Sequence, residues 1–254
     1  MTAPFRSILI TGASSGLGAA LAEYFAAPGV TLSLTGRHAG RLEKITERCK
    51  LRGATIRAAL IDVADRDAMR ETLLPWDEAE PFDLVIANAG ISAGTGESGE
   101  SEQQLRDITA INVAGVVNTV APLLPRLAAR KKGQIGLVAS LAGFRGMPGA
   151  PAYSASKAWV KVYGEALRGT ITKDGIGVSV ICPGFVETPM TAVNRFPMPF
   201  LMNAPRAAGI IARGLARNKG RIAFPLPMLA VVWFFMALPD RLADWVTRKL
   251  PAKG

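Results

Sequence analysis

A tyrosine and a lysine four residues apart, Tyr153 and Lys157, lie in a stretch with a helical pattern. This spacing places both side chains on one face of a helix, with Cβ atoms about 5 to 6 Å apart. A free tyrosine has a pKa of about 10, which is too high for efficient proton exchange at neutral pH. A neighbouring ammonium stabilises the phenolate and lowers that pKa. We therefore expect Tyr153 to act as a general acid or base and Lys157 to tune its pKa.

Two polar residues upstream can complete this chemistry on an oxygen-bearing substrate. Ser140 ends an apolar run, and a serine hydroxyl can hydrogen-bond a substrate oxygen as charge develops on it. Asn112 lies in a helical pattern, where its amide can hold a water molecule that relays protons. Each residue alone also fits an ordinary structural role, such as a strand-end cap or a local hydrogen bond. The functional prediction therefore depends on their occurring together.

A glycine-rich turn near the N-terminus has the composition of a phosphate-binding loop. Residues 7–18, SILITGASSGLG, run from an apolar strand through Gly12, Gly16 and Gly18 into a helical pattern. Such a turn directs backbone N–H groups and the positive end of a helix dipole at one spot, which suits a phosphate. The spacing G-x-x-x-G-x-G differs from the G-x-G-x-x-G dinucleotide fingerprint. A tight turn that only requires small residues therefore stays open as an alternative.

Two other catalytic motifs are matched only in part. Residues 12–16 fit G-x-S-x-G, the nucleophile elbow of α/β-hydrolases, but that enzyme class needs a histidine late in the chain. The single histidine is His38, which comes too early. Ser154 and Lys157 fit the S-x-x-K of serine β-lactamases, whose companion motifs S-D-N and K-T-G are missing. We therefore discount both hydrolase classes.

An alternation of strands and helices must position these residues. Strands are predicted at residues 7–10, 30–35, 55–61, 83–87, 134–140, 177–182 and 221–224, and helices from residue 19 onward and at 39–52, 65–78, 101–130, 152–173 and 206–217. Repeated β-α-β units predict an α/β fold in which a doubly wound parallel sheet carries helices on both faces, as in Rossmann-like folds. Since no linker is evident, we expect residues 1–254 to form a single domain.

Ligands of such sheets bind beyond the carboxyl ends of the strands. The segments that follow successive strands therefore form one group: the glycine turn, Gly36-Arg37, Asp62-Val63, Asn88-Ala89-Gly90, Ser140 and Pro183-Gly184.

This ordered set resembles the short-chain dehydrogenase/reductase family over nearly the whole chain. The motifs that carry the resemblance are residues 11–18, Asn88-Ala89-Gly90, Asn112, Ser140, Tyr153 with Lys157, and Pro183-Gly184 followed by Thr188. Ala87 departs from it, because many relatives have a second asparagine there.

The resemblance implies an oxidoreductase that transfers a hydride between a nicotinamide and a carbonyl or alcohol. It implies a catalytic tetrad of Asn112, Ser140, Tyr153 and Lys157, with Lys157 also reaching the nicotinamide ribose. The cofactor contacts that we expect are Gly12, Ser14, Ser15, Gly16, Leu17, Gly18, Arg37, Asp62, Val63, Asn88, Ala89, Gly90, Tyr153, Lys157, Pro183, Gly184, Val186 and Thr188. The alternative is a catalytically silent relative that binds a dinucleotide as a sensor or scaffold; the intact tetrad argues against it.

The residues after the second strand favour NADP(H) over NAD(H). In NAD-binding members an acidic residue at this point binds the ribose 2′-OH and would repel a 2′-phosphate. Here Gly36 and Arg37 follow Thr35, and a guanidinium can bind a phosphate with charge-assisted hydrogen bonds. The alternative is that Arg37 is only a solvated surface charge. In addition, the basic residue that is often found before the second glycine of the turn is absent, because Ser15 stands at that position.

Residues 185–203 lie where the family places its substrate loop. Their phenylalanines and methionines indicate an adaptable apolar pocket and hence a lipophilic substrate. The alternative is that these side chains only pack the loop against the domain.

The C-terminal extension, residues 225–254, combines an apolar run with basic residues. Seventeen residues from Ile222 to Leu238 carry no charge, and Pro225 and Pro227 leave only residues 228–238 as an uninterrupted helix, too short to span a bilayer. Further apolar residues recur at helical spacing: Leu242, Trp245, Val246 and Leu250. We expect contact with a membrane surface or a partner subunit. A lid or a dimer interface is the alternative.

Composition narrows the remaining function classes. The net charge is +10, and residues 205–254 hold nine basic and two acidic residues, yet no nucleic-acid-binding motif accompanies them. One histidine and two cysteines, Cys49 and Cys182, make a metal site improbable. No signal peptide is recognisable, so we expect a cytoplasmic protein. The C-terminal extension adds peripheral membrane association as an alternative to a fully soluble state. The family resemblance also implies a homodimer or homotetramer.

Overall fold

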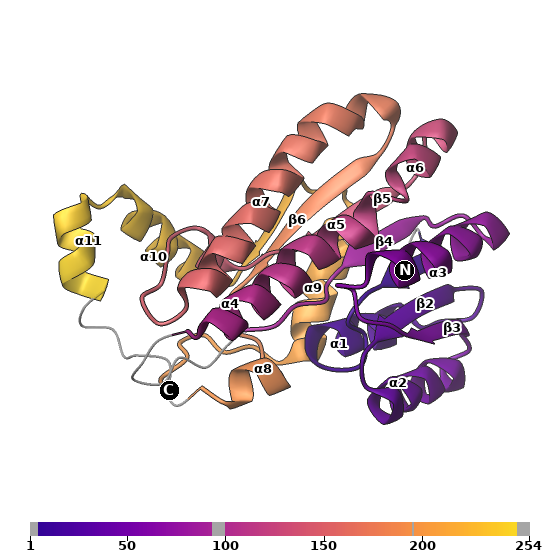
Figure 1. The fold of residues 1–254 in the computed structure, drawn as a ribbon, viewed down its shortest axis with the longest axis horizontal. Helices are drawn as coiled ribbons and strands as arrows, with labels where there is room; N and C mark the ends of the chain where they lie inside the picture. Colours follow the sequence, from indigo (N-terminus) through magenta and orange to yellow (C-terminus); the bar gives the residue numbers. More distant parts are fainter. Residues whose placement is uncertain (1–4, 93–99, 195, 248–254) are drawn as a thin grey trace.

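A seven-stranded parallel sheet forms the centre of the computed structural model, which describes residues 5–92, 100–194 and 196–247 (Figure 1). The strand order is β3-β2-β1-β4-β5-β6-β7, so the chain reverses its direction across the sheet between β1 and β4. The strands are β1 (Ser7–Ile10), β2 (Thr31–Gly36), β3 (Thr55–Leu60), β4 (Leu84–Ala87), β5 (Gln134–Val138), β6 (Gly177–Pro183) and β7 (Arg221–Phe224). The predicted strands are confirmed, with bounds that agree within two residues.

Two helical layers cover the sheet, one on each face. Ile8 and Ile10 of β1 belong to the core shared with α1 (Gly16–Phe25), α2 (Ala39–Leu51) and α9 (Ala204–Ala216). Leu9, which points to the other face, belongs to the core shared with α3 (Arg66–Ala79), α5 (Gly115–Val120) and α7 (Pro151–Ile171). Since both faces are covered, β1 is buried along its whole length. The doubly wound α/β prediction is confirmed.

The single helix predicted over residues 101–130 is wrong in detail, because the structure interrupts it twice. α4 (Glu102–Thr109) begins at a capping box and widens into a π-helical turn, η1 (Ala110–Ala114), before α5. Pro122 then falls in a turn ahead of α6 (Leu124–Arg130), since proline lacks an N–H and collides with the preceding helical turn. The π-helical turn contains Asn112, so the irregularity lies at a predicted site residue.

The run Glu102–Arg130 is long and apolar enough to cross a membrane, by length and composition alone. Its most apolar window is 44% buried within the domain, and α4 and α5 contact α7 and α3.

Most of the remaining helices follow the carboxyl ends of strands: η2 (Leu141–Gly143), α8 (Pro189–Ala192), α10 (Leu226–Ala237) and α11 (Asp240–Thr247). η3 (Thr172–Asp174) lies at the other end of the sheet, between α7 and the start of β6. α8 gives the predicted substrate loop a structured centre, while residue 195 of that loop lies outside the described residues. α10 starts two residues earlier than predicted, because Pro227 falls in its first turn, where a proline is tolerated. Residues 248–254, with the basic end of the extension, also lie outside the described part.

Candidate active site

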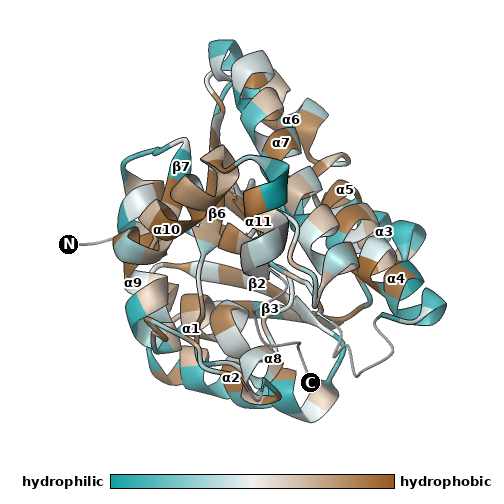
Figure 2. Ribbon diagram, turned by 90° about the vertical axis from the view of Figure 1, so that its left-hand side faces the viewer, coloured by the Kyte–Doolittle hydropathy of each residue, from teal (hydrophilic) through white to brown (hydrophobic). Residues whose placement is uncertain are grey.

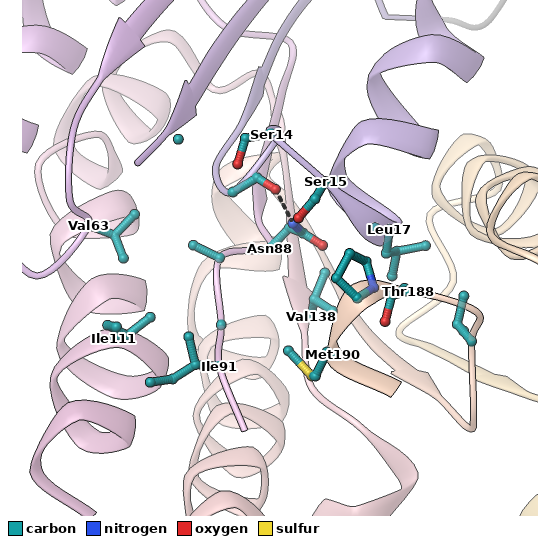
Figure 3. A pocket seen from close by; sticks show the side chains of 18 of the residues that line it. Ser14, Ser15, Leu17, Val63, Asn88, Ile91, Ile111, Val138, Thr188 and Met190 are labelled. Carbon is teal, nitrogen blue, oxygen red and sulfur yellow. Dashed lines mark hydrogen bonds between the residues drawn. The ribbon is translucent and has the colours of Figure 1, made fainter. Parts of the chain in front are cut away.

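A pocket of about 330 Å³ lies beyond the carboxyl ends of β1 and β4, where the direction of the strand order reverses. This is the place at which doubly wound sheets bind ligands. Figure 3 shows Ser14 and Ser15 at one end of the pocket, Val63 and Ile111 on one side, and Leu17 with Thr188 on the other.

Most residues predicted from the sequence line this pocket. They are Gly12, Ser14, Ser15, Gly16, Leu17, Gly18, Arg37, Val63, Asn88, Ala89, Gly90, Ser140, Tyr153, Lys157, Pro183, Gly184, Val186 and Thr188. Asp62 and Asn112 are not in the lining but contact residues that are. Sequence reasoning did not assign His38, Arg41, Ile61, Ile91, Ile111, Val138 and Ala139 to the site, whereas the remaining lining residues, Gly36, Pro189, Met190 and Thr191, lie in segments that it did place there. Several of these are next to a predicted strand end, so a wider window there would have found them.

The glycine turn brings the backbone close to its neighbours. Gly12 has a φ of +67°, and a Cβ on it would lie 2.7 Å from the Cα atom of Ala89. A Cβ on Gly18 would collide with the carbonyl oxygen of Gly12. Ser15, at the N-cap of α1, makes no side-chain capping hydrogen bond. The turn therefore requires glycine for steric reasons. Because the Ser15 side chain does not bond the N–H groups in the first turn of α1, an anion could bind them without displacing it.

Thr11 and Asn88 join the turn after β1 to the turn after β4. The Thr11 hydroxyl accepts hydrogen bonds from the backbone N–H groups of Asn88 (3.1 Å) and Ala89 (3.2 Å). The Asn88 amide donates in return to the carbonyl oxygens of Thr11 (2.9 Å) and Gly12 (3.3 Å). These bonds hold the two sides of the pocket at a fixed separation. Sequence analysis included Thr11 in a motif without giving it a role.

Ser140, Tyr153 and Lys157 meet at the wall formed by β5 and α7. Tyr153 shares a hydrogen bond with Ser140, whose Oγ atom also accepts from the N–H of Ala142 at 3.1 Å. The Nζ atom of Lys157 lies 5.8 Å from the centre of the Tyr153 ring and donates to the Val138 carbonyl at 2.9 Å. The predicted pair therefore shares one helix face, but the ammonium is fixed by the backbone of β5.

Burial shifts the two titratable groups in opposite directions. It raises the pKa of Tyr153, with the Ser140 hydrogen bond acting against that rise. It lowers the pKa of Lys157 to about 8. Burial therefore has a larger effect on the pKa of Tyr153 than the Ser140 hydrogen bond has, and the expectation that Lys157 stabilises the phenolate stays a prediction.

Asn112 is fully buried and bonded on all sides. Its Oδ1 atom accepts from the N–H of Ile91 (2.8 Å), and its Nδ2 atom donates to the Ile91 carbonyl (2.9 Å) and to Ser156 Oγ (3.0 Å). Both amide hydrogens are therefore donated to protein acceptors, which leaves none for the water molecule that we expected this amide to hold. The side chain instead links the π-helical turn to the chain after β4 and to α7.

Basic side chains lie beyond the end of β2. Arg37 pairs with Asp62 at 3.2 Å, and both side chains are well exposed, at 45% and 39%. His38 and Arg41 also line this part of the pocket. Because the pair is solvated, it contributes little stability and leaves the guanidinium free to rearrange.

The sequence model of the family described as short chain dehydrogenase matches residues 6–197. The chain belongs to the short-chain dehydrogenase/reductase family. It is similar to an uncharacterized oxidoreductase of Myxococcus xanthus, with 38% identity over 97% of this chain and 98% of that protein. The protein is accordingly an oxidoreductase of this family, and the comparisons give no support to a silent sensor or scaffold.

Two solved members of the short-chain dehydrogenase/reductase family share the fold of this chain. A short-chain dehydrogenase from Sphingobium yanoikuyae in complex with NADPH has a TM-score of 0.80, 25% identity, and coverage of 97% of this chain and 96% of that one. One from Mycobacterium paratuberculosis bound to NAD has a TM-score of 0.76, 26% identity, and coverage of 86% and 94%. The pocket of this chain fits such a dinucleotide, because its glycine turn leaves space that a Cβ would fill and the first turn of α1 lies beside it.

Proposed function

We propose that the protein is an NADP(H)-dependent dehydrogenase or reductase of a lipophilic carbonyl or alcohol, with Tyr153 as general acid or base. The observation that carries this proposal is the placing of Ser140, Tyr153 and Lys157 on one wall of the pocket that the glycine turn opens. A bound nicotinamide would supply or accept the hydride, and the protein must supply the proton.

The proton transfer follows from the burial of the phenol. Burial keeps Tyr153 protonated at neutral pH, so the hydroxyl can donate to the oxygen of a carbonyl substrate. Ser140, which hydrogen-bonds Tyr153, is placed to donate to the same substrate oxygen as negative charge develops on it. When protonated, Lys157 stabilises the phenolate that remains, across the 5.8 Å that separate its Nζ atom from the ring.

We assign Asn112 a positioning role within this tetrad. Its three hydrogen bonds connect Ile91, beside the pocket, to Ser156, and the Ser156 hydroxyl donates to the Tyr153 carbonyl at 2.7 Å. Asn112 therefore acts on the chemistry by fixing the backbone at Tyr153.

The preference for NADP(H) is supported by the charges beyond β2. Arg37 and Arg41 line the pocket there, and the carboxylate that pairs with Arg37, Asp62, is exposed and only weakly held. A 2′-phosphate can replace that carboxylate as the partner of Arg37 with stronger, charge-assisted hydrogen bonds. We also propose that the other predicted cofactor contacts that line this pocket bind the same dinucleotide.

The lipophilic substrate is supported by the apolar side of the pocket. Ile91, Ile111 and Met190 line it, and Phe185 packs edge-on against Phe196 in the substrate loop, with ring centres 5.9 Å apart. These side chains offer few hydrogen-bond partners to a polar substrate.

We also propose a cytoplasmic, single-domain homodimer or homotetramer, associated through the helices around Asn112 and Tyr153. Leu105 of α4 and Trp159 and Val162 of α7 are exposed apolar residues on these helices. Peripheral membrane contact through residues 225–254 belongs to the same proposal.

Oxidation of NADPH by the purified protein with a panel of aliphatic and aromatic ketones tests the proposed function. We expect turnover that rises with the apolar size of the ketone and a higher kcat/KM with NADPH than with NADH. Turnover of no ketone or alcohol in the panel, or a higher kcat/KM with NADH, would contradict it.

A further inference from the structure

The two C-terminal helices carry many exposed apolar side chains. On α10 the exposed side chains are Leu226 (73%), Val231, Trp233 (59%), Phe234 (67%) and Met236, and on α11 they are Leu242 and Trp245. No residue of α10 is fully buried. Figure 2 shows apolar residues gathered along α10, and Figure 1 shows α10 and α11 at one end of the molecule. We call the exposed side chains named here the outer face.

The opposite side of α10 packs against the wall of the active site. Met228, Leu229 and Val232 join the core that contains Leu141, directly after Ser140. The sulfur of Met228 lies only 2.7 Å from the place that a Cβ on Gly184 would occupy, and Gly184 lines the pocket. The outer face is therefore one helix thickness away from the pocket wall.

Arg145 fixes both helices to the loop that follows Ser140. Its guanidinium donates to the Phe235 carbonyl at the end of α10 (3.1 Å) and pairs with Asp240 at the start of α11 (3.5 Å). The side chain of Arg145 is 24% exposed and partly shields its hydrogen bond to Phe235, whereas Asp240 is 96% exposed, so the ion pair to α11 is solvated. The packing of α10 and the bond to Phe235 therefore set the orientation of the outer face of α10 relative to the pocket.

The chemistry of the outer face matches the surface of an anionic bilayer. Tryptophan and phenylalanine side chains favour the headgroup boundary. α10 has 12 residues and is therefore about 18 Å long, against a hydrocarbon core of about 30 Å, so it can lie on a bilayer but cannot cross it. The sequence carries no charge from Ile222 to Leu238, and the stretch that follows has four basic residues, Arg241, Arg248, Lys249 and Lys253, against the two acidic residues Asp240 and Asp244.

Charge also argues against a second copy of the chain as the occupant. A symmetric dimer through this face would bring two basic C-terminal extensions together, each on a chain of net charge +10. Like charges repel one another, which disfavours such a dimer. An anionic leaflet instead attracts basic residues, and each lysine or arginine near its surface contributes about 1 kcal/mol to the free energy of membrane binding.

We propose that the outer face of α10 and α11 docks on the surface of a bilayer that contains anionic lipid, and that docking holds the substrate side of the active site toward the bilayer. This inference deepens the proposed function and rests on it for its second half, because a lipophilic substrate dissolves in the membrane. Met228 and Arg145 are the contacts that transmit the orientation.

Flotation of the full chain with vesicles tests the docking without any need for turnover. The probes are vesicles of phosphatidylcholine with phosphatidylglycerol and vesicles of phosphatidylcholine alone. The variant Trp233→Ser/Phe234→Ser removes two large outer-face side chains, and Leu51→Ser on α2 is the matched control because Leu51 is 88% exposed far along the chain from the outer face. Substitutions at such exposed positions change folding stability little.

We expect the wild type and Leu51→Ser to float with the anionic vesicles, less so at high salt, and the double variant to bind about tenfold more weakly or less. The rate of NADPH oxidation with a water-soluble ketone in the absence of vesicles should be the same for all three proteins. A wild type that does not float, or a double variant that floats equally well, overturns the docking. A wild-type dimer that becomes a monomer in the double variant, without flotation of either, assigns the face to a second copy instead. If the wild type floats but no ketone is turned over, the docking stands and the proposed function fails.

Discussion

The Nζ atom of Lys157 lies 5.8 Å from the centre of the Tyr153 ring and donates a 2.9 Å hydrogen bond to the carbonyl of Val138. One end of α7 is thereby tied to β5, two residues before Ser140. Burial raises the pKa of the Tyr153 phenol and lowers the pKa of the Lys157 ammonium, so it favours the neutral form of each side chain.

This arrangement predicts the pH dependence of carbonyl reduction. The pKa of Lys157 is lowered to about 8, so the ammonium is present below that pH and is lost above it, whereas burial raises the pKa of Tyr153, so the phenol still holds its proton where the ammonium is lost. We expect kcat/KM for the ketone to be level at neutral pH and to fall above about pH 8. The measurement is a pH profile of kcat/KM with saturating NADPH. A plateau extending far into the alkaline range would show that the ammonium is not required.

Substitution of Arg37 tests the cofactor preference. Because a guanidinium–phosphate contact contributes about 1.5–3 kcal/mol, Arg37→Ala should lower kcat/KM with NADPH by about 10- to 100-fold and leave the value with NADH nearly unchanged. Steady-state kinetics with both cofactors measure this. Arg70→Ala, at an exposed position on α3, is the control and should change neither value. Equal losses with NADPH and NADH would remove Arg37 from phosphate recognition.

Two glycine-to-alanine variants test whether the glycine turn requires glycine more strictly than an ordinary helix position does. Gly18→Ala places a methyl group against the Gly12 carbonyl and the Asn88 amide, so we expect a loss of about 1–3 kcal/mol in stability together with weaker NADPH binding. Gly40, on α2, has nothing within 4 Å of a new Cβ, and Gly40→Ala should be neutral or stabilise by up to about 1 kcal/mol. Thermal unfolding with and without NADPH checks both. Equal behaviour of the two variants would contradict the close approach in the turn.

Asp77 carries a buried ion pair close to Phe82, just before β4 and away from the pocket. Its side chain is 1% exposed, accepts two 2.8 Å hydrogen bonds from Arg130, and accepts a third from the N–H of Phe82 at 3.0 Å. Removing one member of such a pair leaves the other unsatisfied, so Asp77→Ala should lower the free energy of unfolding by about 3 kcal/mol. Urea unfolding measures the loss. The exposed Glu71→Ala on the same helix should change stability by less than about 0.5 kcal/mol, and a similar small effect of Asp77→Ala would show that the pair is not structural.

The sequence was sufficient to predict the sheet, because buried parallel strands such as β1 are short apolar runs and the residues after them meet at one edge. It was also sufficient to predict most of the pocket lining for the same reason. The breaks at Pro122 and the early start of α10 at Pro227 follow from proline geometry and were readable in principle.

Other features depend on contacts between distant segments and leave no local pattern. The π-helical turn at Asn112 is accompanied by hydrogen bonds to Ile91 and Ser156, which lie 21 and 44 residues away in sequence. The Lys157 bond to Val138 and the balance between burial and hydrogen bonding at Tyr153 likewise require the packed structure. Spacing predicted which side chains meet; it did not predict which partner each one takes.

The central claim, that Tyr153 supplies the proton, is tested most directly by comparing turnover with cofactor binding in Tyr153→Phe. This change removes the hydroxyl and keeps the ring, so we expect kcat to fall by about 10²-fold or more while the Kd for NADPH, measured by fluorescence titration, stays within about twofold of the wild type. Lys157→Met should damage both quantities. A Tyr153→Phe protein that keeps more than about a tenth of the wild-type kcat, a change in barrier below about 1.4 kcal/mol, would contradict the assignment.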